Sequence, residues 1–598
     1  MAAVPVITTR MLDRFEIAHA LREIGALLEL EGENPFKIRA YETGARALEG
    51  LSGDLATLVA EKRLTDIPGI GEALAGKIAS LHLTGRSETL DKLRARHPPG
   101  ILELLQVPDL GPKKIAALHA ALGVATLADL EAACRAGRVA GVKGFGGKTQ
   151  ARILEGIERV RTRSADRRVL LADALLEAEP LVAHLRAAPA ALAVELAGSA
   201  RRGRETVGDL DVVAASHDPA AMADALAGSP GTVEVSSQGD TKITARLAGG
   251  MHVDLRVVPP EDFPTLLHHL TGSKAHHVKL RGIARDQGYT LSEWGLYRLA
   301  PENTDPDLPP DPSRKVPVES EEALYRALGL AYVPPELRED AGELEAARDG
   351  TLPADLVRLE DVRGMVHCHT TWSDGRATIE EMARAADALG IEYLTITDHS
   401  QTAGYAGGLT ADRLRAQWDE IDRVQERVKV KLLRGSEADV LEDGALDWPD
   451  EILEELDVVV ASVHSRMKMD EDQMTRRLVR AMSVPVFKIW GHGVGRLLLE
   501  REPYAVRVEE VLDALAASRG AVEVNGDPRR LDLEPRHLRA ARARGIPIVL
   551  SVDAHSTGSL GYLRYAVTTA RRGWVRRGEV LNTRGAAEFA AAVRPIGP

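Results

Sequence analysis

The stretch "MVHCHTTWSDG", residues 365–375, places two histidines two positions apart, with an aspartate five positions after the second. If a β-strand ends here, His367 and His369 lie on one face and offer two imidazole nitrogens to a single metal ion. Asp374 adds a carboxylate oxygen from the residues that follow. By itself the stretch is equally compatible with a solvated loop, so the interpretation depends on further ligands along the chain.

The chain after residue 360 alternates apolar strands with helical stretches. Seven segments, from "GMVHCHT" at residue 364 to "IPIVLSVDAH" at residue 546, have the character of parallel strands, which predicts an α/β sheet or barrel. Barrel enzymes carry their sites at the carboxyl ends of the strands. The polar residues at these ends are His367, His369, Asp374, Asp398, His399, Glu437, His464, His492, Asp553 and His555.

Histidine and carboxylate ligands without thiolate suit zinc, manganese or iron. Their number exceeds the needs of one ion, so we expect a cluster of two or three. Such a cluster activates water and stabilises the attacking and leaving oxygens, which predicts hydrolysis of phosphoesters.

The motifs "HCHTTWSD", "TDHS", "GSEA", "SVHS", "GHGVGRLL" and "SVDAH" resemble those of the PHP (polymerase and histidinol phosphatase) family over about residues 360–598. The resemblance implies a distorted seven-stranded (β/α)7 barrel with a trinuclear metal site. It also implies that Asp398 orients a ligand and that Arg496 grips a phosphate. In "HGVGR" the proline that relatives tend to have after the histidine is absent. The ligands implied are His367, His369, Asp374, His399, Glu437, His464, His492, Asp553 and His555.

In "GSARRGRETVGDLDVV", residues 198–213, Asp209 and Asp211 lie two apart in a β-branched segment and should share one strand face. Asp254 in "HVDLRVV" supplies a third carboxylate from another strand. Three converging carboxylates form an oxygen site suited to Mg²⁺ or Mn²⁺, and two such ions serve nucleotidyl transfer. Gly198 and Ser199 precede a turn where backbone N–H groups can approach phosphate.

This segment resembles the nucleotidyltransferase fold, and "TGSKAHHVKLR" from Thr271 resembles family X DNA polymerases. The resemblance implies that Asp209, Asp211 and Asp254 bind catalytic metal, with Asp254 as general base. Arg256 would adjust Asp254, and Arg281 would meet the DNA minor groove. His269 and Leu270 replace an aromatic pair, which leaves sugar discrimination open, and His277 replaces an asparagine. The implied triphosphate and dNTP contacts are Gly198, Ser199, Arg202, Gly272, Ser273 and His277.

"IPGIGEALAGKI" from Ile67 and "VPDLGPKKIAAL" from Val107 share an apolar-Pro-x-apolar-Gly pattern before a lysine-bearing helix, and "VKGFGGKTQARIL" is a looser copy. They resemble helix–hairpin–helix motifs, which bind the DNA backbone without reading sequence. The predicted backbone contacts are Gly69, Gly71, Gly111 and Lys113. Lys77 falls where the polymerase beta lyase domain has its Schiff-base lysine, but Ala73 replaces a phosphate-binding lysine, so lyase activity stays open.

Composition agrees with a multidomain protein. The 598 residues carry a net charge of −13, yet residues 1–168 hold 25 lysines and arginines against 21 acidic residues. Two cysteines and the lack of a long apolar run predict a cytoplasmic protein without a membrane partner. We expect a monomer.

The expected domains are a helical lyase-type domain, a fingers-type helical domain, a palm, a thumb-type domain, a linker and a PHP domain, at 1–90, 91–165, 166–260, 261–335, 336–360 and 361–598. The expected function is a family X repair polymerase that fills short gaps in gapped or nicked duplex DNA with dNTPs, with a PHP 3′-5′ exonuclease or 3′-end processing activity. The alternatives are a DNA-end nuclease or phosphatase with a weak polymerase domain, and a non-catalytic DNA-end scaffold.

Overall fold

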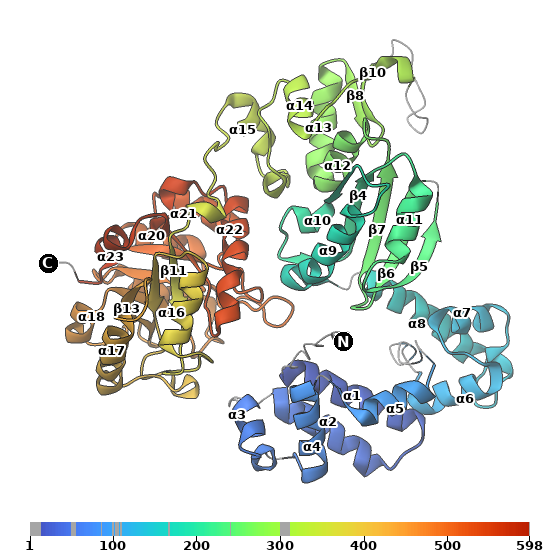
Figure 1. Cartoon of the computed structure of the whole chain (residues 1–598), viewed down its shortest axis with the longest axis horizontal. Helices are drawn as coiled ribbons and strands as arrows, with labels where there is room; N and C mark the ends of the chain where they lie inside the picture. The colour runs from blue at the N-terminus through green and yellow to red at the C-terminus, as the bar shows by residue number, and fades with distance from the viewer. Residues whose placement is uncertain are drawn as a thin grey trace, which may run out of the picture. The chain divides into compact units, whose positions relative to one another are not determined.

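The structure is a computed structural model that describes residues 14–49, 55–67, 69–84, 86–98, 101, 104, 107, 110–165, 168–239, 241–299 and 311–596. The chain divides into two compact units, Met1–Arg167 and Arg168–Pro598, which are described separately (Figure 1). Across the described residues no single helix has the length and apolarity to span a membrane. One bent pair of helices meets the requirement by length and composition only, Lys114–Leu122 with Leu127–Arg135.

The first unit is helical, as the sequence predicts. Leucine and isoleucine side chains from successive helices, among them Ile17, Ile78, Ile115 and Ile153, share one buried core. The helices are α1 (Arg14–Leu30), α2 (Pro35–Glu49), α3 (Leu55–Ala60), α4 (Glu72–Thr84), α5 (Glu88–Arg96), α6 (Pro112–Leu122), α7 (Leu127–Arg135) and α8 (Gly147–Ala165).

The second unit begins with a five-stranded sheet in the order β2-β4-β7-β6-β5. β4 and β7 pair in parallel, and the other neighbours pair antiparallel. The two segments predicted as strands, around Asp211 and Asp254, coincide with β4 and β7. The elements are β1 (Val169–Leu170), α9 (Leu171–Arg186), β2 (Ala193–Leu196), α10 (Gly198–Arg201), β3 (Thr206–Val207), β4 (Leu210–Ala215), α11 (Pro219–Ala227), β5 (Thr232–Gln238), β6 (Lys242–Leu247) and β7 (His252–Val258).

A helical part with a small antiparallel sheet follows, in the strand order β10-β9-β8. Residues 336–360, expected as a linker, are packed rather than extended: Leu337, Leu344 and Leu356 enter the same buried cluster as Leu280 and Leu324. Their apolar side chains lose water contact there, which favours a docked conformation. The elements are α12 (Phe263–Thr271), α13 (Lys274–Asp286), β8 (Tyr289–Ser292), β9 (Gly295–Arg298), β10 (Lys315–Val316), α14 (Glu321–Ala327) and α15 (Glu343–Asp349).

The last part is a nearly closed parallel barrel in the sequential order β11 to β17, which confirms the predicted fold. The residues after β17 approach β11 through three backbone hydrogen bonds, from His369 N–H to the Ala554 carbonyl at 2.8 Å, from Ala554 N–H to the His367 carbonyl at 3.0 Å and from Val552 N–H to the Val366 carbonyl at 3.3 Å. The strands are β11 (Gly364–Cys368), β12 (Tyr393–Ile396), β13 (Lys431–Asp439), β14 (Val458–Ser462), β15 (Lys488–Trp490), β16 (Gly520–Asn525) and β17 (Ile548–Ser551).

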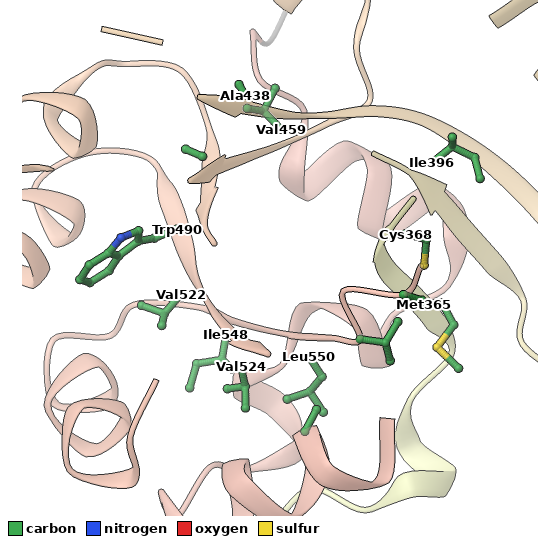
Figure 2. Close-up of a cluster of buried hydrophobic side chains, with 14 of the residues drawn as sticks. Met365, Cys368, Ile396, Ala438, Val459, Trp490, Val522, Val524, Ile548 and Leu550 are labelled. Atoms are coloured by element: carbon green, nitrogen blue, oxygen red, sulfur yellow. The ribbon is translucent and has the colours of Figure 1, made fainter. Parts of the chain in front are cut away.

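Alternating side chains give the barrel two apolar layers. Trp490, Val522 and Leu550 point outward from the ring of strands, towards the surrounding helices (Figure 2). The other set forms a separate cluster with Phe589 and Val593 of α23, which leaves the carboxyl ends of the strands for polar groups. The helices are α16 (Ile379–Ala388), α17 (Ala411–Gln425), α18 (Asp450–Glu455), α19 (Glu471–Ser483), α20 (Val508–Ala516), α21 (Pro535–Ala543), α22 (Leu563–Arg572) and α23 (Ala586–Val593).

Candidate metal centre and nucleotidyl-transfer site

The structure brings all nine predicted barrel ligands together at the carboxyl ends of the strands. They form four overlapping groups whose ligand atoms lie within 4.8 Å of one another. Four of the ligands, His367, His369, His399 and Glu437, each belong to two groups, so neighbouring positions share ligands. The groups are His369, Asp374, His399 and His555; His367, His369 and Asp553; His367, Glu437 and His492; and His399, Glu437 and His464.

Glu437 lies at the centre of the cluster. Its Oε1 is 2.9 Å from His492 Nε2 and 3.2 Å from His464 Nε2, and its Oε2 is 3.0 Å from His399 Nδ1. Burial raises the pKa of this carboxyl, but the surrounding imidazoles, His464 foremost, outweigh burial and hold the pKa well below its usual value. Glu437 is therefore a carboxylate able to bridge cations.

Three of these residues have left-handed backbone conformations, with φ of 65° at His367, 26° at His492 and 48° at Asp553. A non-glycine residue pays of order 1–3 kcal/mol for such a conformation, which persists where the surroundings enforce it. At His367 it accompanies a register shift between β11 and β12. The rings of His367 and His369 do converge, with centroids 5.2 Å apart, but through this bulge rather than by regular strand alternation.

The donor set fits a metal cluster. His367 Nε2, both ring nitrogens of His369 and His399 Nδ1 are buried with carboxylate oxygens 3.0–3.7 Å away, but none of them has a partner in hydrogen-bonding geometry. Buried imidazole nitrogens normally have a partner, and neutral imidazole is a common metal ligand. Together with the carboxylates of Glu437, Asp374 and Asp553, these nitrogens would hold cations.

Sequence reasoning missed two buried carboxylates that support the ligands. Glu523 Oε1 lies 2.5 Å from His367 Nδ1, and its Oε2 accepts the backbone N–H of His492. Asp439 Oδ1 lies 2.5 Å from His464 Nδ1. Such partners fix the tautomer and orientation of a ligating imidazole. Strand alternation was a signal for Asp439, which follows Glu437 by two positions on β13, whereas Glu523 had no local signal.

Two further predictions are refined by the contacts. Asp398 contacts the residues beside the ligand His369, because Thr370 N–H and Oγ1 donate to its carboxylate at 2.8 and 2.6 Å. The guanidinium of Arg496 donates to the carbonyls of Arg530 and Leu531, so its predicted phosphate contact would require these bonds to open and stays a prediction. Arg530 also approaches the cluster, with Nε 3.0 Å from Asp553 Oδ2.

In the five-stranded sheet, Asp211 and Asp254 are direct register partners on the parallel strands β4 and β7. Asp209 is exposed in the bend immediately before β4. Burial, followed by the charges of Asp209 and Asp254, raises the pKa of Asp211 to about 7. The three predicted carboxylates therefore form a crowded anionic site suited to divalent cations.

Two residues of β6 complete this site and were missed by sequence reasoning. Thr244 Oγ1 donates to Asp254 Oδ1 at 2.7 Å, and Lys242 Nζ lies 2.8 Å from Asp254 Oδ2. They could be identified only through the antiparallel register of β6 with β7.

The short helix α10 is joined to the Thr-Gly-Ser segment by arginines. Arg202 donates to the Thr271 carbonyl at 2.7 Å and to Glu339 at 2.8 Å, so its predicted triphosphate role requires release from Glu339. Arg201, which sequence reasoning passed over, donates to Thr271 Oγ1 at 2.8 Å and pairs with buried Glu321 at 2.6 Å. Ser199 lies in α10 itself.

The other predicted nucleotide and DNA contacts surround this segment. Ser273 caps α13 by accepting the His276 N–H. Gly272 lies against the His277 ring, because a β-carbon placed on Gly272 would lie 2.7 Å from His277 Nε2. Burial first, then His269, lowers the pKa of His277 to about 3, so the ring is neutral. Arg281 is exposed on α13, and Arg256 lies 3.9 Å from Glu293.

In the helical unit, Gly69 has a φ of 92°, and Gly71 immediately precedes α4. Gly111 caps the amino end of α6. The backbone of Lys113 lies in α6, but its side chain is outside the described residues. Lys77 is half-buried on α4 and donates weakly to the Ala73 carbonyl at 3.4 Å, so its lyase role stays a prediction.

Four family models match the chain. They are a helix-hairpin-helix domain at residues 13–87, a SAM-like helix-hairpin-helix tandem at 101–159, the DNA polymerase beta thumb at 266–339 and the PHP domain at 366–527. Each match falls on the corresponding helical, mixed or barrel part described above.

Curated relatives cover the whole chain or its barrel. The DNA polymerase/3'-5' exonuclease PolX of Bacillus subtilis (strain 168) is 36% identical over 582 residues, which is 97% of this chain and 99% of the relative. A probable phosphatase of Thermoanaerobacter sp. (strain X514) is 29% identical over 230 residues, 36% of this chain and 89% of the relative. The chain therefore belongs to the bacterial family X DNA polymerases that carry a C-terminal PHP domain.

Proposed function

We propose that this chain is a DNA repair polymerase that fills short gaps and also processes 3′ ends with its PHP barrel. The observation that carries the proposal is that the second unit contains both the three-aspartate site and the nine-residue barrel cluster. Asp211 lies opposite Asp254 in one sheet. The barrel gathers nine ligands into four overlapping groups.

At the polymerase site, Asp209, Asp211 and Asp254 would hold Mg²⁺ or Mn²⁺, which neutralises the triphosphate of an incoming dNTP. Asp254 is proposed as general base for the primer 3′-hydroxyl. Thr244 and Lys242 hold its two carboxylate oxygens, and this fixes the orientation of the carboxylate. Ser199 and Arg202 would contact the triphosphate, Gly272, Ser273 and His277 the nucleotide, and Arg256 and Arg281 the primer and template.

At the barrel, two or three ions of manganese, zinc or iron are proposed, because the ligands are nitrogen and oxygen without thiolate. Bound there, such ions supply a metal-activated hydroxide for phosphodiester hydrolysis. Arg530 supplies a guanidinium beside the cluster, which can hold the phosphate of a DNA 3′ end. The proposed reaction is 3′-5′ removal of nucleotides.

The helix–hairpin–helix motifs support binding to gapped or nicked duplex DNA through phosphates. Gly69, Gly71, Gly111 and Lys113 are the proposed contacts. We further propose that the protein acts as a monomer.

A second candidate, a nuclease or phosphatase with a weak polymerase domain, is favoured by the similarity of the barrel alone to probable phosphatases. A 5′-labelled primer in a one-nucleotide gap separates the candidates. With dNTPs and Mg²⁺ or Mn²⁺, extension should be lost in Asp209→Ala/Asp211→Ala only. Without dNTPs, shortening should be lost in His367→Ala/His369→Ala only. Shortening without any extension by the unmodified chain would favour the second candidate.

A further inference from the structure

An exposed tyrosine stands at the edge of the barrel's ligand cluster. The Tyr405 side chain is 61% exposed, although large aromatic residues usually bury most of their surface. Its ring centroid lies 6.1 Å from that of His399 and 6.2 Å from that of His464. None of the residue roles proposed above involves this ring.

The loop that presents Tyr405 is tightly built. Ala403 and Ala406, on either side of it, are buried. Ala403 N–H donates to the Ser400 carbonyl at 3.1 Å, and Gly408 N–H donates to the Ala403 carbonyl at 3.1 Å. A β-carbon on Gly408 would lie 2.0 Å from the Ser400 carbonyl oxygen. The exposure of Tyr405 is therefore imposed by a fixed backbone.

Arg413 ties this loop to the loop that carries two proposed ligands. Its Nη1 donates to the Gly407 carbonyl at 2.8 Å, and its Nη2 donates to the Trp372 carbonyl at 2.6 Å. Trp372 lies between His369 and Asp374 in the sequence. The position of the Tyr405 ring relative to the ligand cluster is consequently set by the same contacts that shape the cluster.

A rigid, exposed aromatic ring beside a phosphodiester-cleaving centre is suited to stack on a nucleobase. Every base offers a π-face, so such a platform binds without reading sequence. A buried core role does not account for a ring that is mostly in water.

We propose that Tyr405 forms a base-binding subsite that stacks on the base at the 3′ end of the strand being shortened. This inference rests on the proposed 3′-5′ exonuclease function and specifies its substrate. The subsite would favour 3′ ends that carry a base over 3′ ends that lack one.

The test pairs a protein change with a substrate change, using the full-length, manganese-loaded chain. One single-stranded oligonucleotide ends in a normal nucleotide, and the other ends in a tetrahydrofuran abasic residue with the same phosphodiester. Release of the terminal residue is followed for the unmodified chain, Tyr405→Ala, Tyr405→Trp and Leu389→Ala. Leu389 is also exposed, but it follows α16, at the opposite end of the barrel from the ligands.

The unmodified chain should favour the normal end over the abasic end by about 5- to 150-fold in kcat/KM, the range expected from one base–aromatic stack. Tyr405→Ala should lose this preference by slowing on the normal end only, while Tyr405→Trp and Leu389→Ala retain it. Primer extension by all variants should be unchanged.

Two results would overturn the inference. In one, Tyr405→Ala keeps the preference; in the other, it slows on both ends equally, which indicates a role in shaping the metal site. If the unmodified chain releases neither terminal residue while still extending primers, the exonuclease function itself fails, and the inference fails with it.

Discussion

A β-carbon placed on Gly198 would lie 2.2 Å from Oδ2 of Asp211, well inside van der Waals contact. Gly198 also has a φ of 63°, a conformation that L side chains rarely adopt. The first residue of the proposed phosphate-binding turn thus lies against a proposed metal ligand, and any side chain at position 198 would meet the Asp211 carboxylate.

Gly198→Ala should therefore displace the Asp211 carboxylate and reduce primer extension about 100-fold, as misplacement by an ångström typically does. Gly231→Ala is the matched control, because Gly231 has a φ of 89° with no atom within 4 Å of the added carbon. If both variants extend primers equally well, the contact with Asp211 has no catalytic consequence. Barrel-dependent shortening serves as the check on folding.

Asp211 should make the metal-free protein sensitive to pH. Its pKa is raised to about 7 in the folded chain, so between about pH 4 and 7 the unfolded chain loses this proton first. Folding stability contributed by this residue therefore falls as the pH rises through that window, and the deficit is complete above pH 7.

In chelator, Asp211→Asn should be more stable than the unmodified chain at pH 8 by roughly 2–4 kcal/mol and no more stable at pH 4. Thermal unfolding at both pH values measures this difference. Adding Mg²⁺ should stabilise the unmodified chain more than Asp211→Asn, because the barrel cluster is the same in both. An equal unfolding temperature at pH 8 would contradict the crowded-carboxylate description.

Glu321 joins α10 to the helical part that follows. Arg201 and the fully buried Arg338 both pair with it, at 2.6 and 2.5 Å. Removing one partner of a buried pair leaves an uncompensated charge and costs about 3–5 kcal/mol. Glu321→Ala should lower unfolding stability by that amount in denaturant titrations, whereas Glu322→Ala, at the exposed neighbouring position, should change it little.

Glu523 should control metal occupancy without being a ligand. Glu523→Gln keeps the shape but replaces one acceptor, so either His367 or the His492 N–H loses its partner. Loss of such a supporting partner typically lowers metal affinity by about 10- to 100-fold. Elemental analysis after dialysis should show fewer bound ions per chain than in Glu451→Gln, with primer extension intact. Glu451 is a suitable control because it is an exposed residue of α18.

Arg530 and Arg496 should have different roles, one in binding phosphate and the other in stability. Arg530→Gln should slow 3′-end shortening by the metal-loaded chain about 10- to 100-fold, because a charged phosphate contact is lost. Arg496→Gln should mainly lower the unfolding temperature, because two backbone carbonyls lose their donor. The reverse pattern would support the sequence-based assignment of Arg496. Bound metal is measured in parallel.

The sequence alone determined the features that depend on local periodicity, namely the strands of the barrel, the residues at their ends and the glycine turns. Strand alternation predicted the barrel and placed carboxylates and histidines at its strand ends. The resemblance to PHP and family X polymerase motifs narrowed these residues to nine proposed barrel ligands and to the three aspartates from Asp209 to Asp254. Glycine spacing likewise located the helix–hairpin–helix turns. These features depend on residues a few positions apart, whose relative direction the backbone fixes.

Tertiary structure alone decided which distant groups meet. Glu523 reaches His367 across 156 positions and Arg201 reaches Glu321 across 120, so neither pairing has a local signal. The register shift at His367, the contact of Arg530 with Asp553 and the exposure of Tyr405 likewise follow from strand register, barrel closure and loop packing. Those depend on the summed burial of the whole chain, which no short stretch of sequence expresses.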